Sequence, residues 1–224
     1  MILELATVVG LAQQCAPSVA VETLVSVVHT ESHFDPYAIG VNAKGVPAPN
    51  PIDRASAAAA ARSLIARGYN IDLGLGQINS ANLRWLGLSI DDVFDPCRNL
   101  AAAARVLASN FLSVARSTPS KEMAIATAMS MYNTGSRSRG FGNGYIGRVY
   151  ASSRVVVPAI RRVAPPRAVV SPATTEYKST VTQPTADIRS PRAQGAWDTT
   201  AGAQTASLMV FGTASKSSRK GQSE

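Results

Sequence analysis

The stretch His29-Thr30-Glu31-Ser32-His33-Phe34-Asp35-Pro36 decides how the rest of the chain is interpreted. An apolar, helix-like segment with Leu24 to Val28 runs into it, and Pro36 forbids further helix because proline lacks a backbone N–H. The Glu31 carboxyl therefore sits on the last turn of a buried helix. Partial desolvation there would raise its pKa, as a general acid near neutrality requires. Alone, the pattern fits a solvated helix-end glutamate better, so Glu31 needs support from elsewhere in the chain.

The two histidines beside Glu31 raise the question of a metal site. His29 and His33 have the four-residue spacing of the zinc motif H-E-x-x-H, but that motif places its glutamate directly after the first histidine. Glu31 comes two residues after His29, roughly 200° around a helix. With only two histidines in the chain, we expect no metal and no cofactor.

Composition limits the classes of partner. The net charge of +8 favours polyanions such as nucleic acid, anionic lipid or acidic cell-wall glycan. No base-stacking aromatics are interleaved with the basic residues, so we expect no nucleic-acid partner. No apolar run is long enough for a membrane span, and no secretory signal peptide is evident at the start.

The cysteines Cys15 and Cys97 are too far apart for a CxxC motif. They are either two free core thiols or one disulfide, and their spacing alone leaves both alternatives open.

The expected architecture is a mainly helical domain over residues 1–156. From residue 157 the periodicity disappears among Pro, Ser and Thr, which predicts a disordered basic tail over 157–224. The expected helices cover residues 3–14, 18–33, 54–67, 80–86, 98–115, 120–132 and a last one from Tyr145.

Two further segments carry polar side chains available to a ligand, although the first of them is also compatible with an ordinary Gly-rich turn. Gly74-Leu75-Gly76-Gln77-Ile78-Asn79 lets backbone approach a ligand, with amide groups at Gln77 and Asn79, and lacks the Gly-Lys-Ser/Thr of a phosphate loop. Ala128-Met129-Ser130-Met131-Tyr132-Asn133-Thr134-Gly135 ends a helix and is followed by Tyr145.

Together and in this order, the three segments resemble the lysozyme-like lytic transglycosylases, and most closely the VirB1 branch that accompanies type IV secretion systems. The resemblance covers roughly residues 10–155 and includes Cys15-Ala16-Pro17, Asp72 and Asp95-Pro96-Cys97. It implies a mainly helical, α+β lysozyme-like fold with a small irregular β-like segment, and Glu31 as the one catalytic acid and base. The glycan cleft would be lined by Ser32, Gln77, Asn79, Tyr132, Asn133 and Tyr145.

The resemblance also implies a reaction and a setting. The family cleaves the MurNAc–GlcNAc bond of peptidoglycan without water and leaves a 1,6-anhydromuramyl end. A Cys15–Cys97 disulfide, a periplasmic location and other type IV secretion components as partners are implied in the same way.

The chain departs from the family's sequence pattern at two glycines. Gly40 follows Ala38-Ile39 where many soluble relatives have serine, so that side-chain contact is expected to be absent or to be supplied by another residue. Gly76 stands where many relatives have methionine, which predicts the loss of a hydrophobic cleft wall.

Two alternatives stay open. One is a hydrolytic lysozyme that uses Asp72 as a second carboxylate beside Glu31. The other is a glycan-binding scaffold component without catalytic activity.

Overall fold

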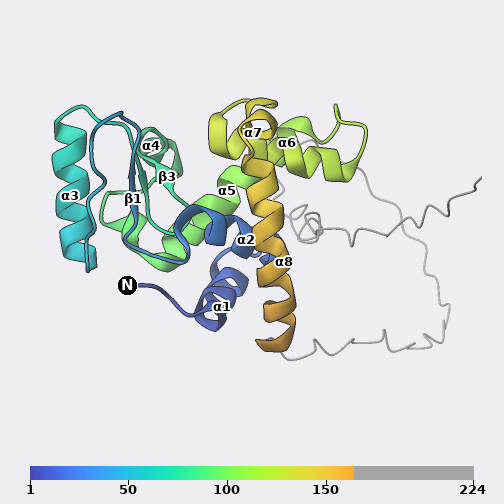
Figure 1. Cartoon of the computed structure of the whole chain (residues 1–224), viewed down its shortest axis with the longest axis horizontal. Helices are drawn as coiled ribbons and strands as arrows, with labels where there is room; N and C mark the ends of the chain where they lie inside the picture. Colours follow the sequence, from blue (N-terminus) through green and yellow to red (C-terminus); the bar gives the residue numbers. More distant parts are fainter. Residues whose placement is uncertain (164–224) are drawn as a thin grey trace, which may run out of the picture.

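The computed structural model describes residues 1–163, and within them the chain is mainly helical with one small antiparallel sheet (Figure 1). The expected fold class is thereby confirmed. The elements are α1 (Leu5–Cys15), α2 (Val21–Ser32), β1 (Ile39–Val41), α3 (Arg54–Ala66), β2 (Ile71–Leu73), β3 (Ile78–Asn79), η1 (Ser80–Asn82), α4 (Leu83–Leu86), η2 (Asp92–Phe94), α5 (Pro96–Val114), α6 (Lys121–Thr134), α7 (Arg139–Gly142) and α8 (Tyr145–Val163).

The helix limits differ from the sequence-based expectations at three places. The helix expected from residue 18 begins at Val21, and the one expected over 80–86 is a 3-10 turn followed by the short α4. The last helix continues to Val163, past the domain limit of 156, and its residue Ile160 is buried. The rest of the expected tail, residues 164–224, lies outside the described residues.

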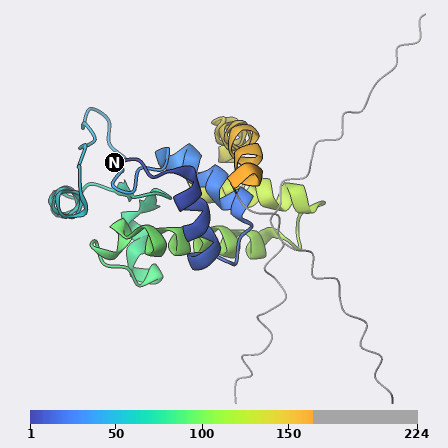
Figure 2. The ribbon, with the colours of Figure 1, turned by 90° about the horizontal axis from the view of Figure 1, so that it is seen from below.

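Helix α2 occupies the centre of the domain. It packs against α8 and α1 and touches α5, and Figure 2 shows it between α8 on one side and α5 on the other. Its residues Leu24, Val25, Val27 and Val28 have no exposed surface. The helix ends at Ser32 because His33 adopts a left-handed conformation with φ 52°. A largely buried helix therefore delivers Glu31 in its last turn.

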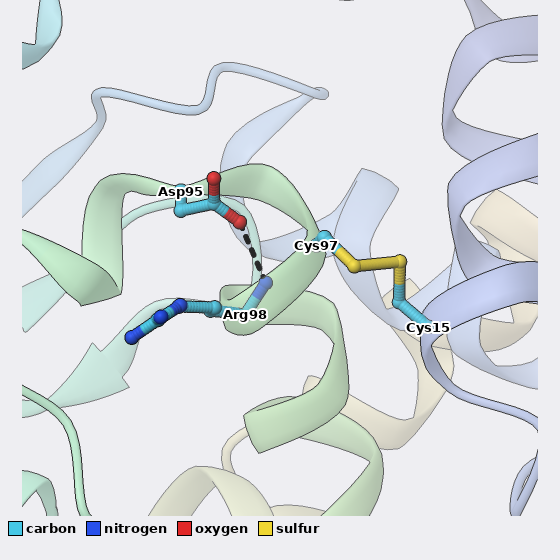
Figure 3. The surroundings of a disulfide bond; sticks show 4 residues. All are labelled: Cys15, Asp95, Cys97 and Arg98. Atoms are coloured by element: carbon cyan, nitrogen blue, oxygen red, sulfur yellow. Dashed lines mark hydrogen bonds between the residues drawn. A yellow bond between two sulfur atoms is a disulfide. The ribbon is translucent and has the colours of Figure 1, made fainter.

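The start of α5 is fixed by a cap and a disulfide, shown in Figure 3. The Asp95 carboxylate accepts a hydrogen bond from the Arg98 N–H, and Pro96 opens the helix at a position that needs no N–H donor. Cys97 in the same turn is bonded to Cys15 at the end of α1, with 5.4 Å between their Cα atoms. A bridge that closes so long a loop stabilises the fold by about 4–5 kcal/mol in the chain-entropy treatment.

The sheet has strand order β1-β2-β3, with both pairs antiparallel. Ile71 and Leu73 of β2 are fully buried, so the residue between them, Asp72, faces the other side by the two-residue period of a strand. Its partners across the sheet are Gly40 and Asn79. The sheet thus presents one carboxylate flanked by a glycine and an amide.

Candidate active site

A polar cleft of about 510 Å³ runs across the domain between the sheet, α5 and α6. Of the residues predicted from the sequence it is lined by Glu31, Asp72, Gln77, Asn79, Tyr132 and Asn133. Ser32 and Tyr145 are not among its lining residues. The cleft is also lined by residues that were not predicted as site residues from the sequence: Asn42, Asn82, Trp85, Val106, Asn110 and Met131.

Glu31 lies in this cleft and is half-buried. Burial raises the pKa of its carboxyl to about 7, and the nearby negative charge of Asp72 acts in the same direction. A hydrogen bond from Tyr145 and the positive charge of Arg148 oppose this rise in pKa. A carboxyl with this pKa exists in both protonation states near neutrality, so it can give a proton and later take one back.

Tyr145 does not line the cleft but forms a hydrogen bond with the Glu31 carboxyl. Its hydroxyl donates to Glu31 Oε1 at 2.5 Å, and the residue is 1% exposed. Asn143 accepts from the Tyr145 backbone N–H at the start of α8, and the Arg148 guanidinium lies over the Tyr145 ring. Tyr145 thus contacts the Glu31 carboxyl directly, and the sugar contact expected from the sequence stays a prediction.

Tyr132 on α6 is held by the turn between β2 and β3. Its hydroxyl donates to the Gly76 carbonyl at 2.6 Å, and burial together with the charges of Glu31 and Asp72 raises its pKa well above the ordinary value. A Cβ atom on Gly76 would lie 2.9 Å from the Tyr132 hydroxyl and 2.8 Å from the Ala103 Cβ. Ala103 and Tyr132 thus occupy the space beside Gly76, and the expected loss of a cleft wall there stays a prediction.

Gln77 is tied to the backbone. Its Nε2 donates to the carbonyls of Ala38 at 3.1 Å and Gly74 at 2.9 Å, which uses both amide hydrogens. Its Oε1 lies 2.8 Å from where a Cβ on Gly40 would be. A serine at position 40 would place its Cβ too close to this oxygen, whereas glycine leaves room for it.

Asp72 is the centre of an amide network on the cleft wall. Its Oδ1 accepts from Asn79 at 2.7 Å and its Oδ2 from Asn42 at 2.8 Å. Asn79 also exchanges hydrogen bonds with Asn70 in both directions, at 2.6 and 2.9 Å. Both carboxylate oxygens are thus held in place by neutral donors.

The remaining predicted residues lie differently. The Ser32 hydroxyl points back along α2 and donates to the Val28 carbonyl at 3.3 Å, so the structure does not bring it into the cleft. Asn133 is at the cleft edge, where its Oδ1 accepts from Asn143 at 2.9 Å. Among residues 1–163 the Asn133 amide hydrogens have no hydrogen-bond partner, and a role in substrate binding stays a prediction.

His29 faces α8. Its Nδ1 lies 3.0 Å from the Ser152 hydroxyl, and burial followed by the nearby His33 lowers its pKa. Within residues 1–163, no group of three or more His, Cys, Asp or Glu side chains is placed to hold a metal ion. In the same part of the chain, no helix is both long and apolar enough to cross a membrane.

Comparison of the chain with known proteins identifies its family. Residues 10–147 match the Transglycosylase SLT domain. The chain is 38% identical over 156 residues to "Protein virB1" of Rhizobium radiobacter, an alignment that covers 70% of this chain and 64% of that protein. It is 37% identical over 173 residues to "Type IV secretion system protein virB1" of Brucella abortus biovar 1, with 72% of each covered.

The chain thus spans somewhat less than two thirds of the Rhizobium radiobacter relative. No solved structure matches it significantly. The match to the Transglycosylase SLT domain contains the Glu31 helix, the sheet and the start of α8. The chain therefore belongs to the Transglycosylase SLT domain family and has VirB1 proteins among its relatives.

Proposed function

We propose that the protein is a peptidoglycan lytic transglycosylase that cleaves the β-1,4 bond between MurNAc and GlcNAc and leaves a 1,6-anhydromuramyl end. The observation that carries this proposal is the Glu31 carboxyl, which lies in a polar cleft with its pKa raised to about 7 and its position set by Tyr145. Membership of the SLT family supports the same chemistry.

One carboxyl serves both proton transfers of this reaction. Protonated Glu31 gives its proton to the glycosidic oxygen as the bond from that oxygen to C1 breaks, and the acetamido oxygen of the muramyl residue forms a bond to C1. Glu31, now a carboxylate, takes the proton of the 6-hydroxyl as that oxygen displaces the acetamido group from C1. The enzyme returns to its starting protonation state and no water is consumed.

Asp72 is the group on which the hydrolytic alternative depends. A lysozyme would need it to activate water or to attack C1. Both of its oxygens accept hydrogen bonds from Asn79 and Asn42, which supports a role in ordering the cleft wall. Its negative charge also helps to keep Glu31 protonated.

Two isosteric variants and the reaction products test this mechanism. Glu31→Gln should lower the cleavage rate of purified sacculi by about 10⁴-fold or more, because one residue fills both proton-transfer roles. Asp72→Asn should cost far less, and mass spectrometry should find products that lack the mass of one water. Melting temperatures near that of the wild type would show that both variants fold.

The opposite results identify the alternatives. Reducing-end products together with an inactive Asp72→Asn variant would identify a lysozyme. A folded wild-type chain that binds sacculi without cleaving them would identify the scaffold alternative.

The biological setting follows from the relatives and the disulfide. The Brucella abortus relative is named as a type IV secretion system protein, and disulfides persist in oxidising compartments, which together suggest an extracytoplasmic location. We propose that the protein acts in the periplasm, where it opens the wall locally for assembly of a type IV secretion system. Peptidoglycan strands and other components of that system would be its partners.

A further inference from the structure

Helix α8 turns a positively charged side toward solvent. Its sequence contains four arginines and no Asp or Glu, and one of them, Arg148, already lies over the Tyr145 ring. The other three are exposed together with two apolar residues, at spacings that share one side of a helix: Arg154, Val155, Pro158, Arg161 and Arg162. We call these five residues the α8 face.

The α8 face lies on the outside of the domain. Buried Val149, Val156 and Ile160 hold the opposite side of the helix in the core. In Figure 2, α8 is the outermost of the described helices on the side of α2 that is away from α5. No residue of α8 lines the cleft, so a partner bound to the α8 face would leave the cleft open to a glycan.

The arginines of the α8 face have no ionic partner within residues 1–163. The ion pairs of this part of the chain all join other segments: Met1–Asp35, Arg62–Asp91 and Arg98–Asp92. The helix dipole favours Arg161 and Arg162 in the last turn of α8, but it gives no such benefit to Arg154 in the middle of the helix. Unpaired charges of one sign on one surface attract an anionic partner.

Val155 adds an apolar contact among these charges. It is 66% exposed, and exposed Pro158 follows it about one turn later. The stems of neighbouring arginines can cover apolar groups while their guanidinium groups stay in a polar layer. The α8 face thus combines cations with a shallow apolar surface, as the headgroup region of an anionic bilayer requires.

Other occupants agree less well with the α8 face. A second copy bound through the same face would bring like charges together. Residues 164–224 contain seven Lys or Arg and four Asp or Glu, so this segment has the same sign of charge. A protein groove would hold a helix by a row of apolar anchors, of which this face has two. Neither the cleft nor the cavity beside α3 contains a residue of α8, so no concave site for a peptide adjoins it there.

We propose that the α8 face docks the protein on a bilayer that contains anionic phospholipids. Arg154, Arg161 and Arg162 contact the lipid phosphates, and Val155 enters the headgroup region. The attachment is peripheral and largely electrostatic, so it is reversible and sensitive to salt. It keeps the cleft close to a membrane without covering it, and it does not depend on the proposed function.

Cosedimentation of the full chain with lipid vesicles tests this proposal. The probes are vesicles of phosphatidylcholine alone and vesicles in which part of this lipid is replaced by phosphatidylglycerol. The chain should bind the anionic vesicles and not the neutral ones. Because salt screens exposed charges, binding should weaken as the ionic strength rises above about 0.15 M.

Variants separate the α8 face from the rest of a basic chain. The triple variant Arg154→Gln, Arg161→Gln, Arg162→Gln should weaken binding to anionic vesicles by about tenfold or more, since each arginine near such a surface contributes roughly fivefold. Lysine at the same three positions keeps the charge and should restore binding. The matched control removes three exposed cations from separate segments and should change binding far less: Lys44→Gln, Arg84→Gln and Arg116→Gln.

Val155→Gln tests the apolar contact by itself. It should weaken binding to anionic vesicles by about threefold, because the valine would no longer enter the headgroup region. Melting temperatures near that of the wild type show that each variant folds. The glutamine triple variant should also cleave sacculi at the wild-type rate, because its substitutions lie outside the cleft.

The proposal is overturned if the wild type binds neutral and anionic vesicles equally, or if the glutamine triple variant and its matched control bind alike. A folded triple variant that no longer cleaves sacculi would assign the α8 face to the wall instead. Dimerisation that needs the three arginines would assign it to a second copy. Vesicle binding is measured without cleavage, so a wild-type chain that fails to cleave sacculi would contradict the proposed function and leave this test intact.

Discussion

At the scale of single residues, the state of Glu31 depends on its surroundings more than on its own chemistry. Burial raises its pKa from 4.5 to about 7, so between these values the folded chain binds more protons than the unfolded chain. The stability associated with the neutral carboxyl is therefore present at low pH and is lost as the pH rises through 7. One pKa unit corresponds to about 1.4 kcal/mol, so the rise from 4.5 to about 7 limits the whole effect to roughly 3.5 kcal/mol.

Glu31→Gln should consequently stabilise the fold more at pH 8 than at pH 5, because glutamine has no charge to bury. Urea unfolding of the wild type and the variant at both pH values measures this difference. Glu122→Gln is the control, since hydrogen bonds at the start of α6 lower the pKa of Glu122 and any dependence should have the opposite sign. An equal effect of Glu31→Gln at the two pH values would contradict the desolvation of Glu31.

At the scale of elements, the turn between β2 and β3 joins the sheet to the helices through close backbone contacts. Buried Asn99 on α5 accepts from the Gly76 N–H at 2.7 Å and donates to the carbonyls of Leu73 and Val93. Tyr132 donates to the Gly76 carbonyl from α6. Both the N–H and the carbonyl of Gly76 are thus hydrogen-bonded to helix side chains. The same helices lie so close that a Cβ atom on Gly76 would not fit.

Gly76→Ala should therefore destabilise the fold by about 1–3 kcal/mol, because the new methyl would press on Ala103 and Tyr132. Gly10→Ala is a control for which the expected change in stability has the opposite sign. Gly10 lies exposed in α1 with no heavy atom within 4 Å of where a Cβ would be, so alanine there should stabilise by about 0.5–1 kcal/mol. Urea unfolding compares the two, and a neutral Gly76→Ala would show that α6 can move away from the turn.

At the scale of the whole molecule, α8 closes the domain over α2, and its contribution continues past residue 156. Val156 and Ile160 are 3% and 4% exposed, so both belong to the core. The composition of residues 164–224 still predicts a tail that the catalytic domain does not need. The composition therefore changes at residue 157, whereas α8 and its buried side chains continue beyond that position.

Two truncations test this division. A chain ending at residue 163 should melt like the full chain and cleave sacculi equally well. A chain ending at 156 loses the buried Ile160, which costs about 2 kcal/mol or more and should lower the melting temperature by roughly 5 °C. A low melting temperature for the longer form would place part of 164–224 within the domain, and equal melting of both forms would show that Ile160 is dispensable.

The sequence alone determined the local features of this protein. Apolar periodicity and a proline break placed Glu31 at the end of a buried helix, and the same kind of reasoning located most helices, whereas the β-like segment came from the family resemblance. These features depend on neighbours a few residues apart, so local patterns predict them. The Cys15–Cys97 bridge came from family resemblance, since two cysteines 82 residues apart carry no local signal.

Only the tertiary structure decided what each polar side chain does. Tyr145 reaches Glu31 across 114 residues of sequence, Gln77 uses its amide on backbone carbonyls, and Ser32 turns away from the cleft. Trp85 and Val106 both line the cleft, although nothing in their own segments indicated it. Side-chain contacts of this kind depend on how helices and strands pack, and packing is set by long-range burial that no short stretch of sequence contains.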